Sequence, residues 1–497
     1  MSVSSPSLVS STTAHSRLSL CRHSPTLPPC PGPPRLSSCL SWGRCILRAS
    51  NRMEFEVSYS LDNAEQFWEE LDDILSAPCD SSQAIDNSLR SYLSFSTNFK
   101  EEYLQTEDDI QRCVYKLLGT ALFVKNKEYV RRQFVYCLLQ EDEPPTLQLV
   151  SSVLLLDGQH DNEQQVFNMM KAEGAFPRLV ELIKTIDAAE HKDLHRSLLQ
   201  LLYEMSRIQR LTWEDLAVVD DTFVLYLFQI VEELYDDPND PYSYHVIRVI
   251  LVLNEQYFVA NIPTPPVPLT NRVIKALSTH GHIYKTFGEN MILLLNRETE
   301  ASLTLLILKL LYLVFLNEKT CDYFYTNDLH VLIDIIIRNL LDLPSDDPTS
   351  SAIKHTYLRV LHPLLANSQV NRPPHYKPEE LLKTLEYLSQ TNDNPWRHFE
   401  ANDETTIRLA KRCADVAWLR RRASITSMSP SDADSGRDSP AHGDSGHRAA
   451  AQRLLGMSVP SAGESALSVM EVAVHREKPG VQTPSKERGA AQSQDGN

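Results

Sequence analysis

Glycine is almost absent from the long middle part of this 497-residue chain. Residues 53–422 contain only five glycines, which are Gly119, Gly158, Gly174, Gly281 and Gly288. Tight hairpin turns and loops that cradle phosphate groups depend on glycine, because other residues adopt the required backbone angles only with steric strain. A chain so poor in glycine cannot supply the turns of a many-stranded β fold, and we expect a helical interior.

Helical patterns separated by short breaks follow one another through this part of the chain. In residues 64–77 the apolar side chains fall on one stripe with helical spacing, and Pro78 closes it. Thr106 and Asp109 have the spacing of a capping box, which predicts the start of another helix. Roughly fifteen to twenty helices are expected in all. Further helices are predicted at 144–156, 192–208, 221–235, 242–259, 270–279, 283–296, 300–316, 328–341, 349–365, 378–389 and 402–418.

Pairs and triplets of these predicted helices recur about every 40 residues, which is the spacing of armadillo and HEAT repeats. A stack of such repeats buries one continuous core and leaves broad surfaces for partners. We therefore predict an all-α fold, an armadillo/HEAT-like α-solenoid over residues 53–422, with disordered termini. The oligomeric state stays open.

Charge divides the chain into three parts. Residues 1–52 are rich in Ser and Pro and contain six arginines but no Asp or Glu, which fits either an organellar transit peptide or a translated upstream extension before Met53. The extension is preferred, because the prolines oppose an amphipathic helix. Residues 423–497 have few aliphatic side chains and are predicted to be a disordered regulatory tail. The middle part carries a net charge of −21, which disfavours nucleic acid as a partner and makes basic protein surfaces attractive.

Neither the cysteines nor the apolar runs indicate a metal site, a disulfide framework or a membrane span. The nine cysteines include no CxxC pair, so we expect reduced thiols in a cytosolic protein. The most apolar run, Leu303 to Leu316, is shorter than the roughly 20 residues that span a bilayer and contains Lys309. It is predicted to be a buried core helix, without membrane insertion.

The chain also lacks the common catalytic motifs. GxGxxG, GxxxxGK[ST], HExxH and GxSxG do not occur. His191 and His195 have the i, i+4 spacing that can share a metal ion, but no third ligand is evident, so an exposed helix face is preferred. We predict no cofactor and no enzymatic activity; an enzyme with an unfamiliar helical site would have only this histidine pair.

Two stretches carry short peptide motifs. A PxxP segment could adopt the polyproline II shape that SH3 domains bind, although an inter-helix connector is preferred. Its prolines are Pro263, Pro265, Pro266 and Pro268. Arg421 and Arg422 precede Ser424 in the pattern of arginine-directed kinases. Proline follows three further candidate phosphorylation sites, Ser429, Ser439 and Thr483. Each phosphate would add about −1.5 to −2 charges.

Residues 242–258 are too continuously apolar for a surface helix, so we expect them in the middle of the stack. Four polar residues interrupt the run, namely Arg248, Asn254, Glu255 and Gln256. They either satisfy the ends of neighbouring helices or bind a partner. The structural role is favoured on physical grounds, and the four are also our candidate partner-binding residues.

Five segments in chain order resemble one known family. They are MEFEVSYSLDN at 53–63, YVRRQFVYCLLQ at 129–140, EGAFPRL at 173–179, NEQYF at 254–258 and NDETTIRLAKRCADVAWL at 402–419. This is the fungal leucine-rich family of Ldb-type and Dip-type proteins, related to the C-terminal leucine-rich domain of the Nck-interacting protein with SH3 domain. The resemblance covers about residues 53–420.

The resemblance implies an armadillo-like domain that binds and activates the actin-related protein 2/3 complex without a preformed mother filament. The product would be linear actin filaments that seed branched networks at cortical actin patches during endocytosis. Actin and SH3-domain endocytic proteins are further implied partners. The SH3 domain of the animal counterpart has no equivalent here, so recruitment through that domain is not implied. The alternative is a passive armadillo-like adaptor at the same patches.

Overall fold

A computed structural model describes residues 61, 63–78, 81–161, 163–233, 242–261, 269–344, 347–390, 402–427 and 469, with side chains in the 402–427 segment up to Arg422. These residues form twenty-one α-helices, one 3-10 helix and no β-strand. The all-α prediction is confirmed. Most of the two terminal segments predicted to be disordered lies outside the described residues.

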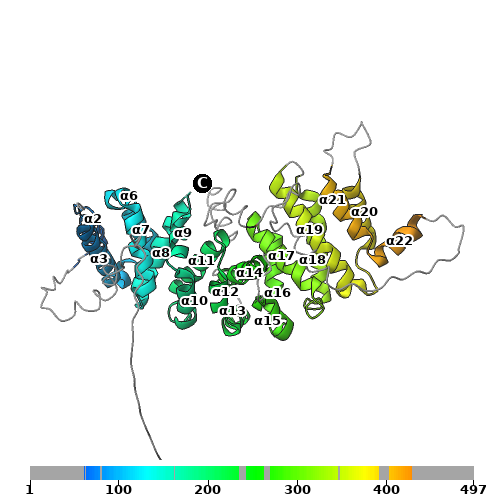
Figure 1. Cartoon of the computed structure of the whole chain (residues 1–497), viewed down its shortest axis with the longest axis horizontal. Coiled ribbons are helices and arrows are strands. Elements are labelled where there is room, and N and C mark those ends of the chain that lie inside the picture. Colours follow the sequence, from blue (N-terminus) through cyan, green and yellow to red (C-terminus); the bar gives the residue numbers. More distant parts are fainter. Residues whose placement is uncertain are drawn as a thin grey trace, which may run out of the picture. The chain divides into compact units, whose positions relative to one another are not determined.

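Most of the long helices form two rows that run in chain order. In Figure 1 this order is seen as the change of colour from blue to orange. The first row consists of α8 (Pro144–His160), α11 (Lys192–Ile208), α14 (Tyr242–Ala260), α17 (Ala301–Leu316), α19 (Pro348–Asn367) and α21 (Glu404–Ala414). The second row consists of α7 (Lys127–Gln140), α10 (Ala175–Thr185), α13 (Asp221–Glu233), α16 (Lys285–Arg297), α18 (Thr326–Asp342) and α20 (Pro378–Ser389). Each first-row helix packs on its second-row neighbour and on the next first-row helix, which is the arrangement of a helical solenoid.

The remaining helices complete the stack. At the N-terminal end lie α2 (Ala64–Leu75), α3 (Ser82–Asn98), α4 (Lys100–Tyr103), α5 (Glu107–Leu118) and α6 (Ala121–Lys125). Between the pairs lie α9 (Gln165–Ala172), α12 (Trp213–Val218), α15 (Arg272–His280) and the 3-10 helix η2 (Gln369–Asn371), and α22 (Ala417–Ser427) follows α21.

The repeat spacing is longer than predicted. The first-row helices begin at residues 144, 192, 242, 301, 348 and 404, so successive pairs start 47 to 59 residues apart rather than about 40. The first three intervals each contain a short third helix, α9, α12 or α15, and the last contains the 3-10 helix η2, whereas the shortest interval, 47 residues, contains none. These and other short helices also carry the total above the predicted upper limit of twenty.

The prediction of one helix over 402–418 was wrong, because this segment forms parts of two helices, α21 and α22. Helix α21 ends at Ala414, and the N–H of Asp415 closes it by donating to the carbonyl of Lys411. Helix α22 then starts in a direction that buries Trp418, whose indole N–H donates to the carbonyl of Leu365 in α19 at 3.0 Å. Burial of this tryptophan outweighs continuation of the helix.

The predicted core helix is confirmed as α17. It is buried almost all round because it lies between α14 and α19 in the first row. Its one charged residue, Lys309, is buried and paired with Glu255 of α14 at 2.7 Å. Among the described helices, none is both long and apolar enough to cross a membrane.

Candidate protein-interaction surface

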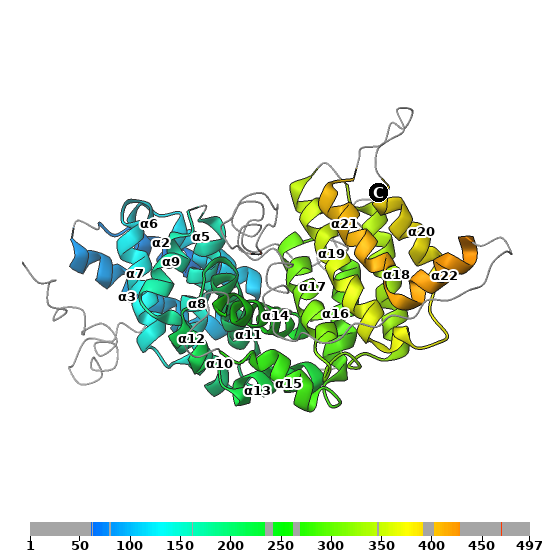
Figure 2. The same ribbon diagram turned by 45° about the vertical axis from the view of Figure 1, so that its right-hand side comes forward.

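The four candidate partner-binding residues lie inside the stack. Arg248 is 2% exposed, Asn254 1%, Glu255 6% and Gln256 7%, all on α14. Figures 1 and 2 both place this helix between α11 and α17. The four side chains contact other helices of the same chain, so the expectation that they form an accessible partner surface is corrected.

Two of these residues satisfy the ends of neighbouring helices. The side-chain amide of Gln256 donates to the carbonyls of Ser206 and Gln209 at the end of α11, at 2.5 and 2.8 Å. Its oxygen accepts from the N–H of Leu211 at 3.0 Å. Asn254 accepts a hydrogen bond of 2.8 Å from Asn271, the residue that caps α15. Polar groups exposed at helix ends are thereby paired within the core.

Arg248 belongs to a buried ionic cluster that we call the central clamp, formed by Glu204, Arg207, Arg248, Glu300 and Ser302. Arg207 pairs with Glu204 at 2.8 Å and also with Glu300. Arg248 lies 3.5 Å from Glu204 and 3.7 Å from Glu300, so that two cations face two anions. Ser302 donates to Glu300 at 2.8 Å. The charges balance, and loss of any one would leave an uncompensated buried charge.

Two tyrosines enclose the clamp. The guanidinium carbon of Arg248 lies 3.8 Å from the ring centroid of Tyr203 and 5.2 Å from that of Tyr244. Burial raises the pKa of both tyrosines, so they stay neutral at physiological pH. Together with the Glu255–Lys309 pair, the clamp joins three successive first-row helices, α11, α14 and α17.

The histidine pair does not form the exposed face that was preferred. His195 is fully buried and contacts the carbonyl of Ile183 at 3.0 Å and the hydroxyls of Tyr226 and Tyr242. Burial lowers its pKa below the usual value. His191 precedes α11 as its N-cap residue. Across the described residues, no group of three or more His, Cys, Asp or Glu side chains could hold a metal ion.

The short peptide motifs fall mostly outside the described residues. This applies to the PxxP prolines Pro263, Pro265, Pro266 and Pro268 and to Ser429, Ser439 and Thr483. Ser424 belongs to α22, and the structure describes its backbone only. Among the described cysteines, Cys113, Cys137, Cys321 and Cys413 are all free thiols, and all but Cys321 are buried.

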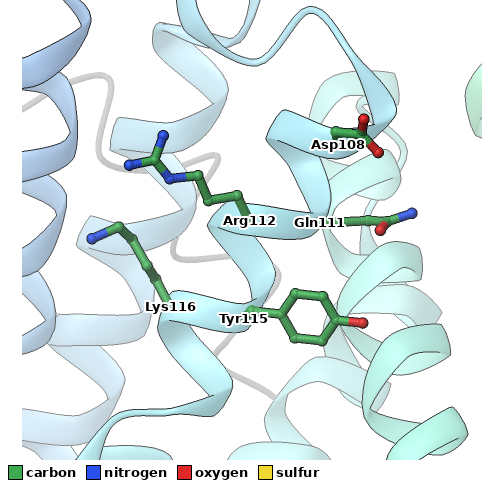
Figure 3. Close-up of a pocket in the computed structure, with 5 residues that line it drawn as sticks. All are labelled: Asp108, Gln111, Arg112, Tyr115 and Lys116. Atoms are coloured by element: carbon green, nitrogen blue, oxygen red, sulfur yellow. The ribbon is translucent and has the colours of Figure 1, made fainter. Parts of the chain in front are cut away.

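The exposed face of α5 borders an open hollow of about 600 Å³. Figure 3 shows Arg112 and Lys116 extending to one side of the helix, and Asp108, Gln111 and Tyr115 extending to the other. The guanidinium of Arg112 stacks 4.1 Å from the ring centroid of Trp68, while Lys116 pairs with Asp72 at 2.6 Å. The predicted capping box of Thr106 and Asp109 is confirmed and fixes where this helix begins.

A second hollow of about 690 Å³ shares Tyr115 with the first and extends to α6, α7, α8 and the start of α9. Tyr115 is 42% exposed and Val124 57%, and both lie at its edge. Below them, Arg131 donates two hydrogen bonds of 2.7 and 2.8 Å to the carboxylate of Asp157. Exposed Tyr and Arg side chains over a rigid base are typical of protein interfaces. We call this region the α5 surface; it could not be predicted from the sequence, because residues of five helices form it.

These features define a class of protein: a helical repeat solenoid with buried ionic ties and open surfaces suited to protein partners. A family model described as SPIN90/Ldb17, leucine-rich domain, matches residues 239–381. The Schizosaccharomyces pombe protein dip1 is 30% identical over 374 residues, which cover 74% of this chain and 98% of dip1. The chain therefore belongs to the SPIN90/Ldb17 leucine-rich domain family, and the resemblance seen in the sequence is confirmed.

Two further relatives agree with this membership. Protein LDB17 of Saccharomyces cerevisiae is 26% identical over 430 residues, covering 76% of this chain and 84% of the relative. Protein LDB17 of Eremothecium gossypii is 29% identical over 378 residues, covering 70% and 80%. The segment matched by the family model begins just before α14 and ends in α20, and it contains Arg248 and Glu300 of the central clamp.

Proposed function

We propose that this protein binds the actin-related protein 2/3 complex and activates it without a preformed mother filament. Linear actin filaments would form first and then seed branched networks at cortical actin patches in the cytoplasm. The observation that carries the proposal is family membership across 98% of the length of dip1, together with the actin-related role that the sequence resemblance implies. The protein acts by binding alone, with neither catalysis nor a cofactor.

The mechanism is a shift between two arrangements of the partner. A protein that binds the active, short-pitch arrangement more tightly than the inactive one favours the active one. Moving the ratio from 1:99 to 99:1 requires about 5.5 kcal/mol of differential binding. An interface of ordinary size can supply this difference.

Rigidity of the solenoid supports this mechanism. A flexible binder would lose part of its binding free energy to its own ordering. The central clamp and the Glu255–Lys309 pair oppose such flexibility because they join α11, α14 and α17 through buried charges. The protein thus offers a fixed template against which the complex can be held.

Assembly of pyrene-labelled actin tests the proposal. The full chain is mixed with purified actin-related protein 2/3 complex and actin monomers, without preformed filaments or other activators. We expect faster assembly than with the complex alone. Assembly no faster than with the complex alone, from a protein whose circular dichroism shows folded helices, would contradict activation and favour the passive adaptor.

A further inference from the structure

Charge is distributed very unevenly along the helical part of the chain. Residues 53–347 contain 23 Lys and Arg against 48 Asp and Glu, a net charge of −25. Residues 348–422 contain 12 Lys and Arg against 8 Asp and Glu, a net charge of +4. The last helices of an acidic protein are therefore basic, and a reversal of this kind points to a partner of opposite sign.

The basic side chains lie at the surface of the last two helices. We call them the basic end; they are Arg408, Lys411, Arg412, Arg420, Arg421 and Arg422, all exposed. Helices α21 and α22, which carry them, appear in orange in Figures 1 and 2. Helix α19, on which α21 packs, contains no Asp or Glu.

Few exposed carboxylates lie on the helices that surround the basic end. Asp403 caps α21 through Thr406 and contacts His355, and Glu379 of α20 pairs with Arg422 at 3.4 Å. Glu386, Glu404 and Asp415 are the other exposed acids among the described residues of α20 to α22, and Glu380 pairs with Lys377 at 3.3 Å. Among the described residues, no carboxylate lies within ion-pair distance of Lys411, Arg412 or Arg421.

We propose that the basic end binds a short acidic polypeptide segment of the partner complex. This inference rests on the proposed function and assigns it a contact surface. Five of the six cations are arginines, whose planar guanidinium can hold a carboxylate through two hydrogen bonds. The acidic segment supplies carboxylates to Lys411, Arg412 and Arg421, which have none within ion-pair distance among the described residues.

The charge distribution favours a short protein segment over a membrane or a nucleic acid. An extended anionic surface would also face the acidic remainder of the helices, which repels it, whereas a short segment touches the basic end alone. The large apolar side chains Trp418 and Leu419 are buried against the helical stack. They are therefore not available at this surface for insertion into a bilayer or for stacking on bases.

A charge-reversal variant of the full chain tests the proposal. Lys411→Glu, Arg412→Glu and Arg421→Glu are combined, and the protein is titrated into fluorescently labelled actin-related protein 2/3 complex while anisotropy is recorded. We expect binding to weaken about tenfold or more, and its dependence on salt to flatten, because surface charge pairs each contribute modestly and are screened by ions. The matched control reverses three exposed cations elsewhere, Arg210→Glu, Arg297→Glu and Lys319→Glu, and should bind like the original.

The outcomes separate this inference from the proposed function. If the original protein binds the complex and the basic-end variant binds equally well, the basic end is not the contact and the proposed function stands. If the original protein does not bind the complex, the proposed function fails and this inference fails with it. Vesicles of phosphatidylserine and phosphatidylcholine are tested in parallel. Vesicle binding that the variant loses while it keeps the complex would assign the basic end to a lipid surface and overturn the proposal.

Discussion

Arg248 places a full positive charge in the middle of the first row, enclosed by Glu204, Glu300 and two tyrosine rings. Replacing it by methionine, which has a similar length, leaves the two carboxylates with one cation fewer. Because breaking a buried ionic cluster strands a charge, we expect Arg248→Met to lower the free energy of unfolding by about 3–5 kcal/mol. Urea unfolding followed by circular dichroism measures the change.

A control variant removes one charge from an exposed ion pair instead of a buried one. Glu128 pairs with Arg132 at 3.1 Å across an exposed helix turn. Glu128→Ala should change the free energy of unfolding by no more than about 1 kcal/mol. A loss of similar size in both variants would contradict the assignment of the clamp as a buried cluster.

His195 makes folding sensitive to acid. Its pKa is lowered by burial, so the folded protein holds it neutral while the unfolded chain takes up a proton near pH 6.5. The resulting stability is fully present above pH 6.5 and is lost as pH falls below it, by at most about 1.4 kcal/mol per pH unit. We expect His195→Gln to flatten this fall in urea unfolding between about pH 7 and pH 5. An unchanged slope in the variant would show that His195 does not contribute.

The sequence contains a pattern that indicates burial of His195, although an exposed helix face was the preferred prediction. The residue lies three and four positions before Leu198 and Leu199, so the apolar stripe of α11 passes through it. The ion pairs of the central clamp could not be predicted from the sequence. Arg207 and Glu300 are 93 residues apart, and helical periodicity carries no information on pairing between repeats.

At the scale of elements, residues close in sequence determine where α5 begins, whereas a contact with a distant helix determines where α21 ends. Thr106 and Asp109 marked the start of α5 because a capping box is satisfied within four residues. The break between α21 and α22 depends on Trp418 reaching α19, a contact that spans 53 residues. The same difference explains why the α5 surface could not be predicted from any one helix.

The packing of α8 on α9 depends on the lack of a side chain at Gly158. A Cβ atom there would lie 2.5 Å from the ring of Phe167, which is fully buried. We expect Gly158→Ala to lower the free energy of unfolding by about 1–3 kcal/mol through overpacking. Combining it with Phe167→Leu should cost less than the sum of the two single changes, because the smaller side chain makes room for the methyl group. Strict additivity in a double-mutant cycle would contradict this contact.

At the scale of the whole molecule, the central clamp reaches beyond nearest neighbours. Helical solenoids are stabilised mainly between adjacent repeats, but the Arg207–Glu300 pair joins α11 to the start of α17, past α14. We therefore expect helices on both sides of α14 to unfold together in the original protein. Glu300→Gln should separate them into two steps, seen by hydrogen exchange in increasing urea. A single transition, shifted equally in all helices, would contradict this coupling.

The proposed activity is activation of the actin-related protein 2/3 complex without a preformed filament. Single-filament fluorescence microscopy tests it most directly, with the full chain, labelled complex and actin monomers on a passivated surface. We predict new unbranched filaments that arise away from any existing filament, each with the complex at one end. New filaments that arise only as branches on existing filaments, or no more of them than with the complex alone, would contradict the claim.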